Sequence, residues 1–246
     1  MELRDRVVVL TGGKRIGATV AVELARRGAD VALSYNRSRT EAETAAGEIR
    51  ALGRRALVCE ADVSKASGCE ALVAAAVAGL GRLDVLVNMA SVYRAVPFDR
   101  MTDEDLQASL DVDLKSAFNC ARAAAPHMKA AGGGRIVNVS DWLAVSQRPR
   151  YKGFVGYFVA KTAVMGLTSA LALELAADRI LVSAIAPGPI LAPPDLADEE
   201  LAAVERATPL GRWGGGGEIA KAVAALVESD FITGETIRVD GGRHLQ

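Results

Sequence analysis

The chain has 246 residues, of which 50% are hydrophobic and 24% are charged, and its formal net charge is -1. These values are typical of a globular protein with a sizeable core, and the length fits one wide α/β domain. The near-zero net charge argues against nucleic acid or an anionic membrane as a partner.

The cysteines and histidines show no pattern of a metal site or a disulfide framework. Cys59, Cys69 and Cys120 have neither spacing, and His127 and His244 have no partner at ligand spacing. The first residues lead into an apolar run without a signal-peptide core, and no uninterrupted apolar run is long enough to span a bilayer. We therefore expect free thiols, no metal and a cytoplasmic protein.

Short apolar runs alternate with segments of helical periodicity along the whole chain. Strands are predicted at 7–10, 31–35, 56–60, 84–88, 135–140, 180–185 and 236–239. Helices are predicted at 16–28, 40–52, 65–80, 103–131, 153–177, 198–206 and 218–228. This order predicts a single α/β domain over residues 1–246, with one doubly wound parallel sheet of about seven strands and helices on both faces. Ligands of such sheets bind at the carboxyl ends of the strands.

The segment TGGKRIG, residues 11–17, joins the first strand to the first helix. Gly12 and Gly17 allow the backbone to approach a pyrophosphate, and the helix that begins at Ile16 offers N–H donors. Lys14 and Arg15 add positive charge. The placement after the first strand favours a dinucleotide site, and the alternative is a glycine-rich turn without a ligand.

The end of the second strand indicates which dinucleotide binds. NAD sites usually carry an acid here for the ribose 2′-OH, but this segment has none. Asn36, Arg37 and Ser38 can instead bind a 2′-phosphate, together with Lys14 or Arg15. We therefore predict NADP(H), although a solvated polar helix start is the plainer interpretation.

Tyr157 and Lys161 lie four residues apart in a predicted helix, so both project from the same face. A fixed ammonium group stabilises a phenolate and lowers the pKa of the phenol, which would make Tyr157 a proton donor for a reduction. A half-buried helix face with a lysine that reaches solvent is the alternative.

With these residues in place, the chain resembles the short-chain dehydrogenase/reductase family over essentially its full length. The matching positions are Thr11-Gly12 with Gly17, Asp62-Val63, Asn88-Met89-Ala90, Tyr157 with Lys161, Pro187-Gly188, and Thr233-Gly234 before Val239-Asp240-Gly241-Gly242. The resemblance implies that Asp62 and Val63 contact adenine, that Asn88 and Ala90 line the cofactor ribose, and that Pro187, Gly188 and Ile190 hold the nicotinamide. It also implies that Lys161 binds the nicotinamide ribose and that Tyr157 delivers the proton.

Departures from the family pattern resemble pteridine reductases and dihydromonapterin reductases. The glycine loop is one residue shorter than usual, and its Lys14-Arg15-Ile16-Gly17 is similar to theirs. In the run that follows Asn88, the resemblance implies that Ser91 contacts substrate and that Tyr93 stacks on a flat heterocycle. A loop aromatic that covers the sheet edge is the alternative for Tyr93.

The pair Ser140-Asp141 places an aspartate where the family usually has its catalytic serine. A carboxylate repels the negative charge that develops on a carbonyl oxygen, whereas a carboxyl group with a raised pKa can help protonate a ring nitrogen. Asp141 therefore favours reduction of a C=N bond. A local shift in the loop before Tyr157 would instead let Ser140 contact the substrate as the ordinary serine does.

Asp113 stands where the family usually has an asparagine that binds a water of the proton relay. The added charge is expected to pair with Lys161 and weaken its effect on Tyr157, which predicts low turnover.

Four basic residues, Arg94, Arg148, Arg150 and Lys152, could receive an anionic substrate tail or form a solvated surface. The segment 188–210 is the expected substrate lid. The family usually forms tetramers through the helices predicted here at 103–131 and 153–177, so a homotetramer is expected.

Three functions remain open. The first is an NADPH-dependent pteridine-reductase-like enzyme that reduces a ring C=N bond through Tyr157 and Asp141. The second is an NADPH-dependent ketoreductase of the 3-oxoacyl-carrier-protein type. The third is a nucleotide-sensing or scaffold protein on a degenerate reductase fold, which the short loop and Asp113 favour and the Tyr157–Lys161 pair opposes.

Overall fold

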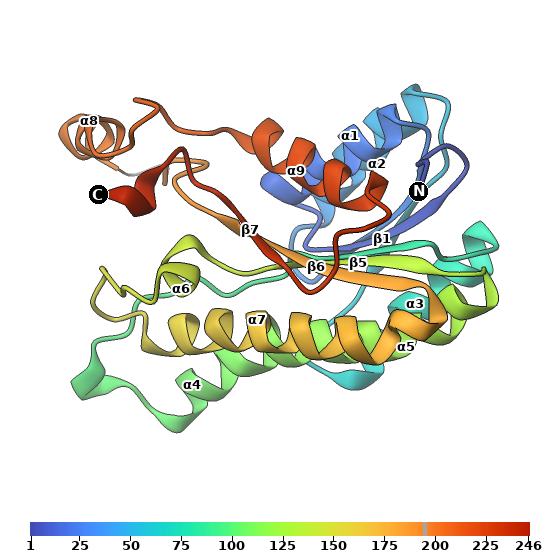
Figure 1. Cartoon of the computed structure of the whole chain (residues 1–246), viewed down its shortest axis with the longest axis horizontal. Coiled ribbons are helices and arrows are strands. Elements are labelled where there is room, and N and C mark those ends of the chain that lie inside the picture. The colour runs from blue at the N-terminus through green and yellow to red at the C-terminus, as the bar shows by residue number, and fades with distance from the viewer. Residues whose placement is uncertain (194–195) are drawn as a thin grey trace.

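The computed structural model describes residues 1–193 and 196–246, so residues 194 and 195 of the expected lid lie outside the described residues. The sheet has seven strands in the order β3-β2-β1-β4-β5-β6-β7, and all neighbouring strands are parallel (Figure 1). The strands are β1 Val7–Thr11, β2 Asp30–Tyr35, β3 Ala56–Glu60, β4 Val85–Asn88, β5 Gly134–Val139, β6 Ile180–Pro187 and β7 Thr236–Val239. The predicted fold class is confirmed.

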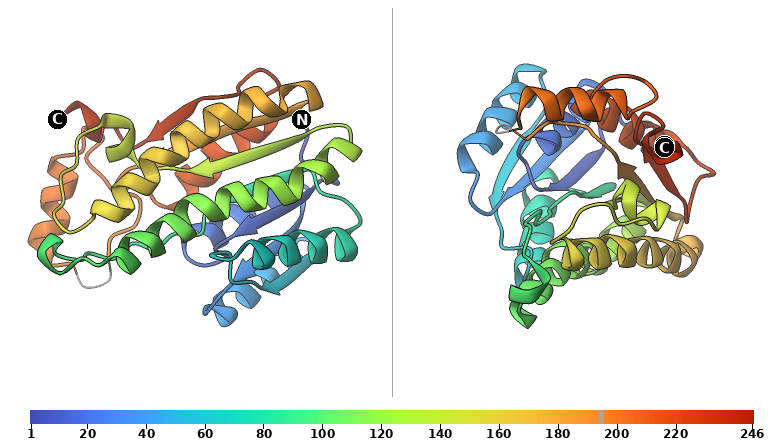
Figure 2. Two further views of the ribbon diagram at one scale, coloured as in Figure 1. Left: turned by 90° about the horizontal axis from the view of Figure 1, so that it is seen from below. Right: turned by 90° about the vertical axis from the view of Figure 1, so that its left-hand side faces the viewer.

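Helices cover both faces of this sheet (Figures 1 and 2). One face carries α1 Ile16–Arg26, α2 Arg39–Ala51 and α9 Gly216–Glu228, and the other carries α3 Ala66–Leu80, α5 Ser116–Ala130 and α7 Val155–Leu175. Three short helices, α4 Asp103–Ser109, α6 Trp142–Ser146 and α8 Asp198–Arg206, lie toward the end of the molecule where the carboxyl ends of the strands point.

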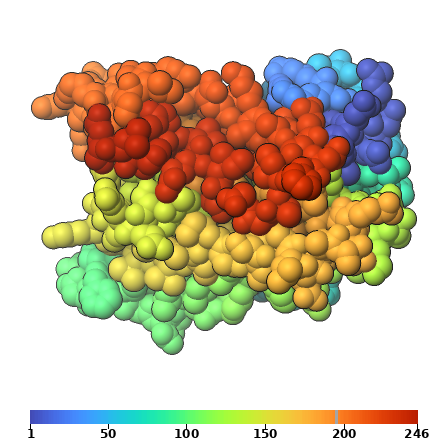
Figure 3. Space-filling model, viewed as in Figure 1, coloured from blue at the N-terminus to red at the C-terminus, as the bar shows by residue number. Residues whose placement is uncertain are grey.

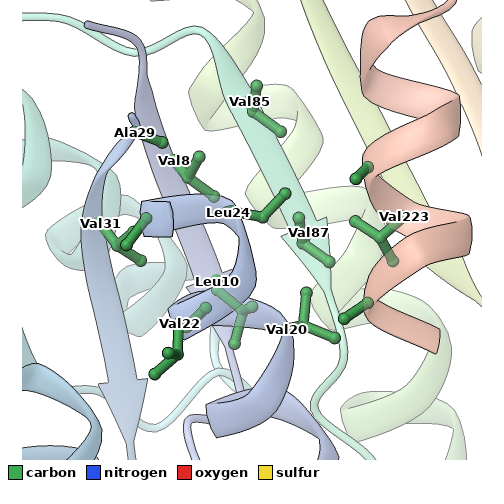
Figure 4. Packing of buried hydrophobic residues seen from close by; sticks show 14 of the residues in the cluster. Val8, Leu10, Val20, Val22, Leu24, Ala29, Val31, Val85, Val87 and Val223 are labelled. Carbon is green, nitrogen blue, oxygen red and sulfur yellow. The ribbon is translucent and has the colours of Figure 1, made fainter. Parts of the chain in front are cut away.

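Two hydrophobic cores lie between the sheet and its helix layers because side chains alternate along a strand. In β1, Val8 and Leu10 belong to the core beneath α1 and α9, where Figure 4 shows them beside Val20 and Val223. Val7 and Val9 point to the opposite core with α3 and α5. A strand buried on both faces explains why this segment is a continuous apolar run in the sequence.

The long helix predicted over 103–131 is interrupted. α4 and α5 are separated by a π-helical turn, Leu110–Lys115, in which the hydrogen bonds skip one residue more than in an α-helix. This turn carries Asp113, whose side chain is buried. The extra residue in the turn places Asp113 on the side of the helix that faces α7, and π-helical turns of this kind are often found at functional sites.

Helix α7 and the turn that follows it, Val155–Asp178, contain an 18-residue stretch with a mean hydropathy of 1.4, of which 28% is buried. By length and composition alone this helix could cross a membrane, contrary to the expectation from the sequence. One side of α7 packs on β6 and the π-helical turn. α7 runs beside α5 on the outer face of the molecule (Figure 2), and Val159 and Leu173 are exposed there.

Candidate functional site

A cleft of about 1550 Å³ opens at the carboxyl ends of the strands. It lies where the strand order changes direction between β1 and β4, which is the usual ligand position in a doubly wound sheet. All the predicted cofactor, substrate and catalytic residues line this cleft except Asn88 and Asp113. The topology thus brings together side chains from the whole length of the chain.

The glycine loop is tightly packed at the start of α1. A Cβ atom at Gly17 would lie 2.0 Å from the carbonyl oxygen of Gly12, so only glycine fits there. Arg15 adopts a left-handed backbone conformation with φ of 53°, which is uncommon for a residue other than glycine. Its guanidinium donates a hydrogen bond of 3.3 Å to the carbonyl of Ala192 in the expected lid. The shortened loop therefore turns sharply at Arg15 and contacts the lid across the cleft.

Three cations line the cleft near the ends of β1 and β2. Lys14, Arg15 and Arg37 have no carboxylate within 4.0 Å in the part of the chain that the structure describes. Glu60, an acid at the end of the neighbouring strand β3, does not pair with these cations. It accepts a hydrogen bond from the Tyr35 hydroxyl. A cluster of unpaired cations suits a phosphate group.

The loop after β3 is built around Asp62. Its carboxylate accepts hydrogen bonds from the backbone N–H and the hydroxyl of Ser64, and these bonds together with Lys65 hold the pKa of Asp62 below its usual value despite partial desolvation. Gly68 lets α3 begin close to this loop, because a Cβ atom there would lie 2.2 Å from the Asp62 carbonyl oxygen. Val63 lies beside it on the cleft wall.

Asn88 lies beneath the cleft and not on its wall. Its amide donates to the Asn138 side chain at 2.9 Å, while its own side-chain oxygen has no hydrogen-bond partner among the described residues. Ala90 does line the cleft, and its N–H donates to the Thr11 hydroxyl at 3.1 Å. The Asn88 side chain therefore links β4 to β5 beneath the cleft, whereas Ala90 lies on the cleft wall.

Tyr157 and Lys161 project from α7 toward the end of β5. The Tyr157 hydroxyl donates to Asp141 Oδ2 at 2.9 Å. Lys161 Nζ lies 2.9 Å from Asp113 Oδ1 and donates to the Val139 carbonyl, also at 2.9 Å. The expected pairing of Asp113 with Lys161 is confirmed, and both side chains are buried.

Ser140 faces away from the ligand position of a catalytic serine. Its hydroxyl donates to the backbone carbonyl of Lys161 at 2.8 Å, and the residue is only 2% exposed. Asp141 Oδ1 accepts from the Leu143 N–H at 2.8 Å at the start of α6, which leaves Oδ2 for Tyr157. The structure therefore puts Asp141, and not Ser140, beside Tyr157.

Burial controls proton binding at this pair. It raises the pKa of Asp141 above the ordinary value, and the hydrogen bonds from Leu143 and Tyr157 and the charge of Lys161 oppose the rise without cancelling it. Burial also raises the pKa of Tyr157 well above its ordinary value, and the charges of Asp141 and Asp113 add to the effect. The pKa of Tyr157 is therefore raised and not lowered as expected, chiefly because burial disfavours the charged phenolate.

Two further aromatic rings pack around Tyr157 at the cleft. Tyr93 stacks on Phe154 with ring centroids 4.4 Å apart and meets Tyr157 edge-on at 4.9 Å. Ser91 points away from this aromatic wall, because its hydroxyl donates to Asp113. Phe154 was not predicted from the sequence, although an aromatic residue three positions before Tyr157, one helical turn away, was a usable signal.

Within the described residues, no group of three or more His, Cys, Asp or Glu side chains could hold a metal ion. The glycine loop, the cations near the end of β2 and the tyrosine, lysine and aspartate side chains of the cleft define a dinucleotide-dependent oxidoreductase.

Comparisons with known proteins agree with this class. A family profile described as Enoyl-(Acyl carrier protein) reductase matches residues 13–244. The 3-oxoacyl-acyl-carrier-protein reductase FabG of Staphylococcus aureus is 34% identical, and the match covers 100% of both chains. The short-chain reductase protein NovJ of Streptomyces niveus is 38% identical over 98% of this chain and 94% of its own. A solved short-chain dehydrogenase of Burkholderia cenocepacia in complex with NADP is 33% identical, with a TM-score of 0.91 and 99% of each chain covered.

The chain belongs to the short-chain dehydrogenase/reductase family and is an NADP-dependent oxidoreductase of that family. These matches do not support the narrower resemblance to pteridine reductases.

The cleft fits NADP(H) on its own geometry. The close approach of Gly17 to Gly12 leaves the room that a pyrophosphate needs, and the unpaired cations near Arg37 suit a 2′-phosphate. Pro187, Gly188 and Ile190 lie on the wall near Lys161, where they could hold the nicotinamide. When bound, the cofactor supplies the hydride of a reduction.

We predict that Arg37→Ala weakens NADPH binding by about 10- to 100-fold, since a hydrogen bond to a charged group contributes about 1.5–3 kcal/mol. NADH binding should stay nearly unchanged because NADH has no 2′-phosphate. Arg39→Ala is the matched control, because Arg39 is exposed at the start of α2 and does not line the cleft. Calorimetry with both cofactors measures the effect, and an equal loss for NADPH and NADH would contradict the assignment.

We also predict that Asp113→Asn lowers the pKa of Tyr157, because it removes a carboxylate charge that raises it. Leaving Lys161 with a neutral partner should also lower the free energy of unfolding by up to about 3–5 kcal/mol. Phenolate absorbance during a pH titration measures the pKa, and subtraction of the Tyr157→Phe titration assigns it. Asp111→Asn, in the same turn but paired on the surface with Lys115, should leave both quantities nearly unchanged.

Proposed function

We propose that the protein is an NADPH-dependent reductase of a 3-oxoacyl thioester or a similar carbonyl compound. The observation that carries this proposal is the Tyr157–Asp141 pair, which presents two acidic groups to one position in the cleft. Similarity to FabG along the whole length of both chains supports the thioester as the substrate class.

In this proposal Tyr157 donates the proton to the carbonyl oxygen. Its raised pKa keeps the proton on the phenol until negative charge develops on the substrate. Asp141 takes the place of the usual serine in its protonated form, in which it can donate a second hydrogen bond to the same oxygen. Burial favours that neutral form because it raises the pKa of Asp141. Lys161 holds α7 in place through its contacts with Asp113 and Val139, and it would bind the ribose of the cofactor.

Reduction of a ring C=N bond is the second candidate, and it has its own support. The carboxyl group of Asp141 adjoins the Tyr157 hydroxyl, so a proton can pass from Asp141 through Tyr157 to a ring nitrogen. The stacked Tyr93 and Phe154 rings form an apolar wall that suits a flat heterocycle.

The two candidates predict opposite effects of replacing Asp141. For a carbonyl substrate, the side chains introduced by Asp141→Asn and Asp141→Ser can still donate a hydrogen bond, so acetoacetyl thioester reduction should persist in both variants. In the wild type that reduction should slow as the pH rises through the raised pKa of Asp141, because the neutral form is lost. This pH dependence should disappear in both variants.

For a dihydropterin, Asp141→Asn removes the proton source and should abolish turnover, as Tyr157→Phe should for both substrates. NADPH consumption with the two substrates side by side decides between the candidates. Tight NADPH binding without turnover of either substrate would instead favour the sensor or scaffold function.

We also propose a cytoplasmic homotetramer that assembles through α5 and α7. A groove of about 370 Å³ between these helices is lined by Phe118, Ala121, Leu171 and Leu175 with charged residues at its rim. Phe118 and Leu173 are large apolar side chains exposed on this face, which is typical of a protein interface. Sedimentation at micromolar concentration should give a tetramer, and a monomer would contradict the proposal.

A further inference from the structure

Two arginines meet one tryptophan at the substrate end of the cleft. The guanidinium carbon of Arg150 lies 5.1 Å from the ring centroid of Trp142, and that of Arg243 lies 5.8 Å from it. Trp142 follows Asp141 directly and is only 5% exposed. Arg150 belongs to the loop after α6, and Arg243 to the turn after β7. Figure 3 shows these two segments in contact, the second in dark red above the first in yellow-green. All three side chains line the cleft.

No aspartate or glutamate side chain pairs with either guanidinium. Among residues 1–193 and 196–246, no Asp or Glu carboxylate lies within 4.0 Å of Arg150 or Arg243. Arg150 donates to the main-chain oxygen of Gln246, and Arg243 donates to that of Ala207, just after α8. A guanidinium group has five N–H donors, so most of them remain available to a ligand.

The other basic residues near Arg150 either have a carboxylate partner or do not line the cleft. Arg94 lines the cleft but is paired with Asp105. Arg148 and Lys152 flank Arg150 in the sequence and do not line the cleft. Of the four basic residues that the sequence suggested for an anionic tail, only Arg150 combines access to the cleft with the absence of a described Asp or Glu partner. Arg243, more than 90 residues further along the chain, joins it through Trp142.

Two acids that line the same cleft, Glu200 and Asp105, bind groups other than Arg150 and Arg243. Glu200 accepts a hydrogen bond from the N–H of Ala197 at the start of α8, and Asp105 accepts from Arg94 and from the N–H of Thr102. Asp240 lies beneath the C-terminal turn, where it accepts from the backbone and the ring of His244. Within the described structure, no Asp or Glu side chain therefore occupies the cleft side of the two cations.

We propose that Arg150 and Arg243 bind an anionic group, a carboxylate or a phosphate, carried by the substrate. The two planar guanidinium groups can donate paired hydrogen bonds to such a group. Trp142 holds both beside Asp141, so a molecule anchored there places its carbonyl group near the Tyr157 hydroxyl. The proposal rests on the proposed function, and it makes the substrate an oxo compound with an anionic tail.

Three acetoacetyl thioesters test the proposal because they share the reacting group and differ only in the tail. N-acetylcysteamine gives a neutral tail, mercaptopropionate gives a carboxylate and phosphopantetheine gives a phosphate. We expect the wild type to have a lower KM for one or both anionic thioesters than for the neutral one. Arg150→Gln and Arg243→Gln should raise that KM by about tenfold or more, as expected for loss of a hydrogen bond to a charged group, with little change in kcat.

The neutral thioester and the control variant make the result specific. Neither variant should change the KM for the neutral thioester, and Arg148→Gln should change the KM for none of the three. A preference for the carboxylate or for the phosphate identifies the source of the anion. Equal KM values for all tails in the wild type, or variants without effect on the anionic thioesters, would overturn the proposal and leave the carbonyl reductase function intact.

A binding measurement separates this proposal from the reaction itself. Free mercaptopropionate and phosphopantetheine contain no reducible group, and calorimetry with the enzyme–NADP⁺ complex reports their affinity. Affinity for either anion that falls about tenfold in both arginine variants supports the site even if no thioester is reduced. Binding of neither anion, or affinity that both variants retain, overturns the proposal whatever the turnover.

Discussion

The buried ion pair between Lys161 and Asp113 is the interaction on which the rest of the site depends. It joins α7 to the π-helical turn between α4 and α5, and its two partners also bind the end of β5 and the loop after β4. Two charges at 2% and 3% exposure have lost most of their hydration, and only their mutual attraction and these additional hydrogen bonds offset that cost. Removing either partner would leave an unpaired charge in the interior. The orientation of α7, and with it the position of the Tyr157 hydroxyl, is therefore tied to this pair.

Burial is the main influence on proton binding at the centre of the cleft. An isolated ammonium group would favour the Tyr157 phenolate, but the pKa of Tyr157 is raised, first by burial and then by the charges of Asp141 and Asp113. Burial also raises the pKa of Asp141, so it favours the protonated form of both groups. A site that favours protonated groups suits reduction, in which a proton is given up, better than oxidation, in which a base must accept one. Both candidate substrates share this direction.

The sequence predicted much of this architecture because the relevant signals are local. The bounds predicted for β3, β7 and α8 agree with the structure, since each is a short periodic segment between turn residues. The pairing of Asp113 with Lys161 was also predictable, because motif positions fixed both side chains near the cleft. The interrupted helix at 110–115 was not, since nothing in the local pattern distinguishes a π-helical turn from a continuous helix. Nor could the sequence show that Ser140 turns toward the Lys161 carbonyl, because that orientation depends on a contact between residues 21 positions apart.

The cations of the cleft come from two separate parts of the sheet. Lys14, Arg15 and Arg37 follow β1 and β2, Arg243 follows β7 and is joined by Arg150, and Asp141 follows β5, which lies between these strands in the sheet. With the proposed ligands, the first group would attract a phosphorylated cofactor and the second an anionic substrate, so that their reacting ends would meet near Tyr157. Negative charge that develops on the substrate oxygen disfavours the ionised form of a nearby carboxyl group, so it strengthens proton retention by Asp141 at the moment the proton is needed. An aspartate beside Tyr157 is then compatible with carbonyl reduction, because the reaction itself opposes the ionisation that would inhibit it.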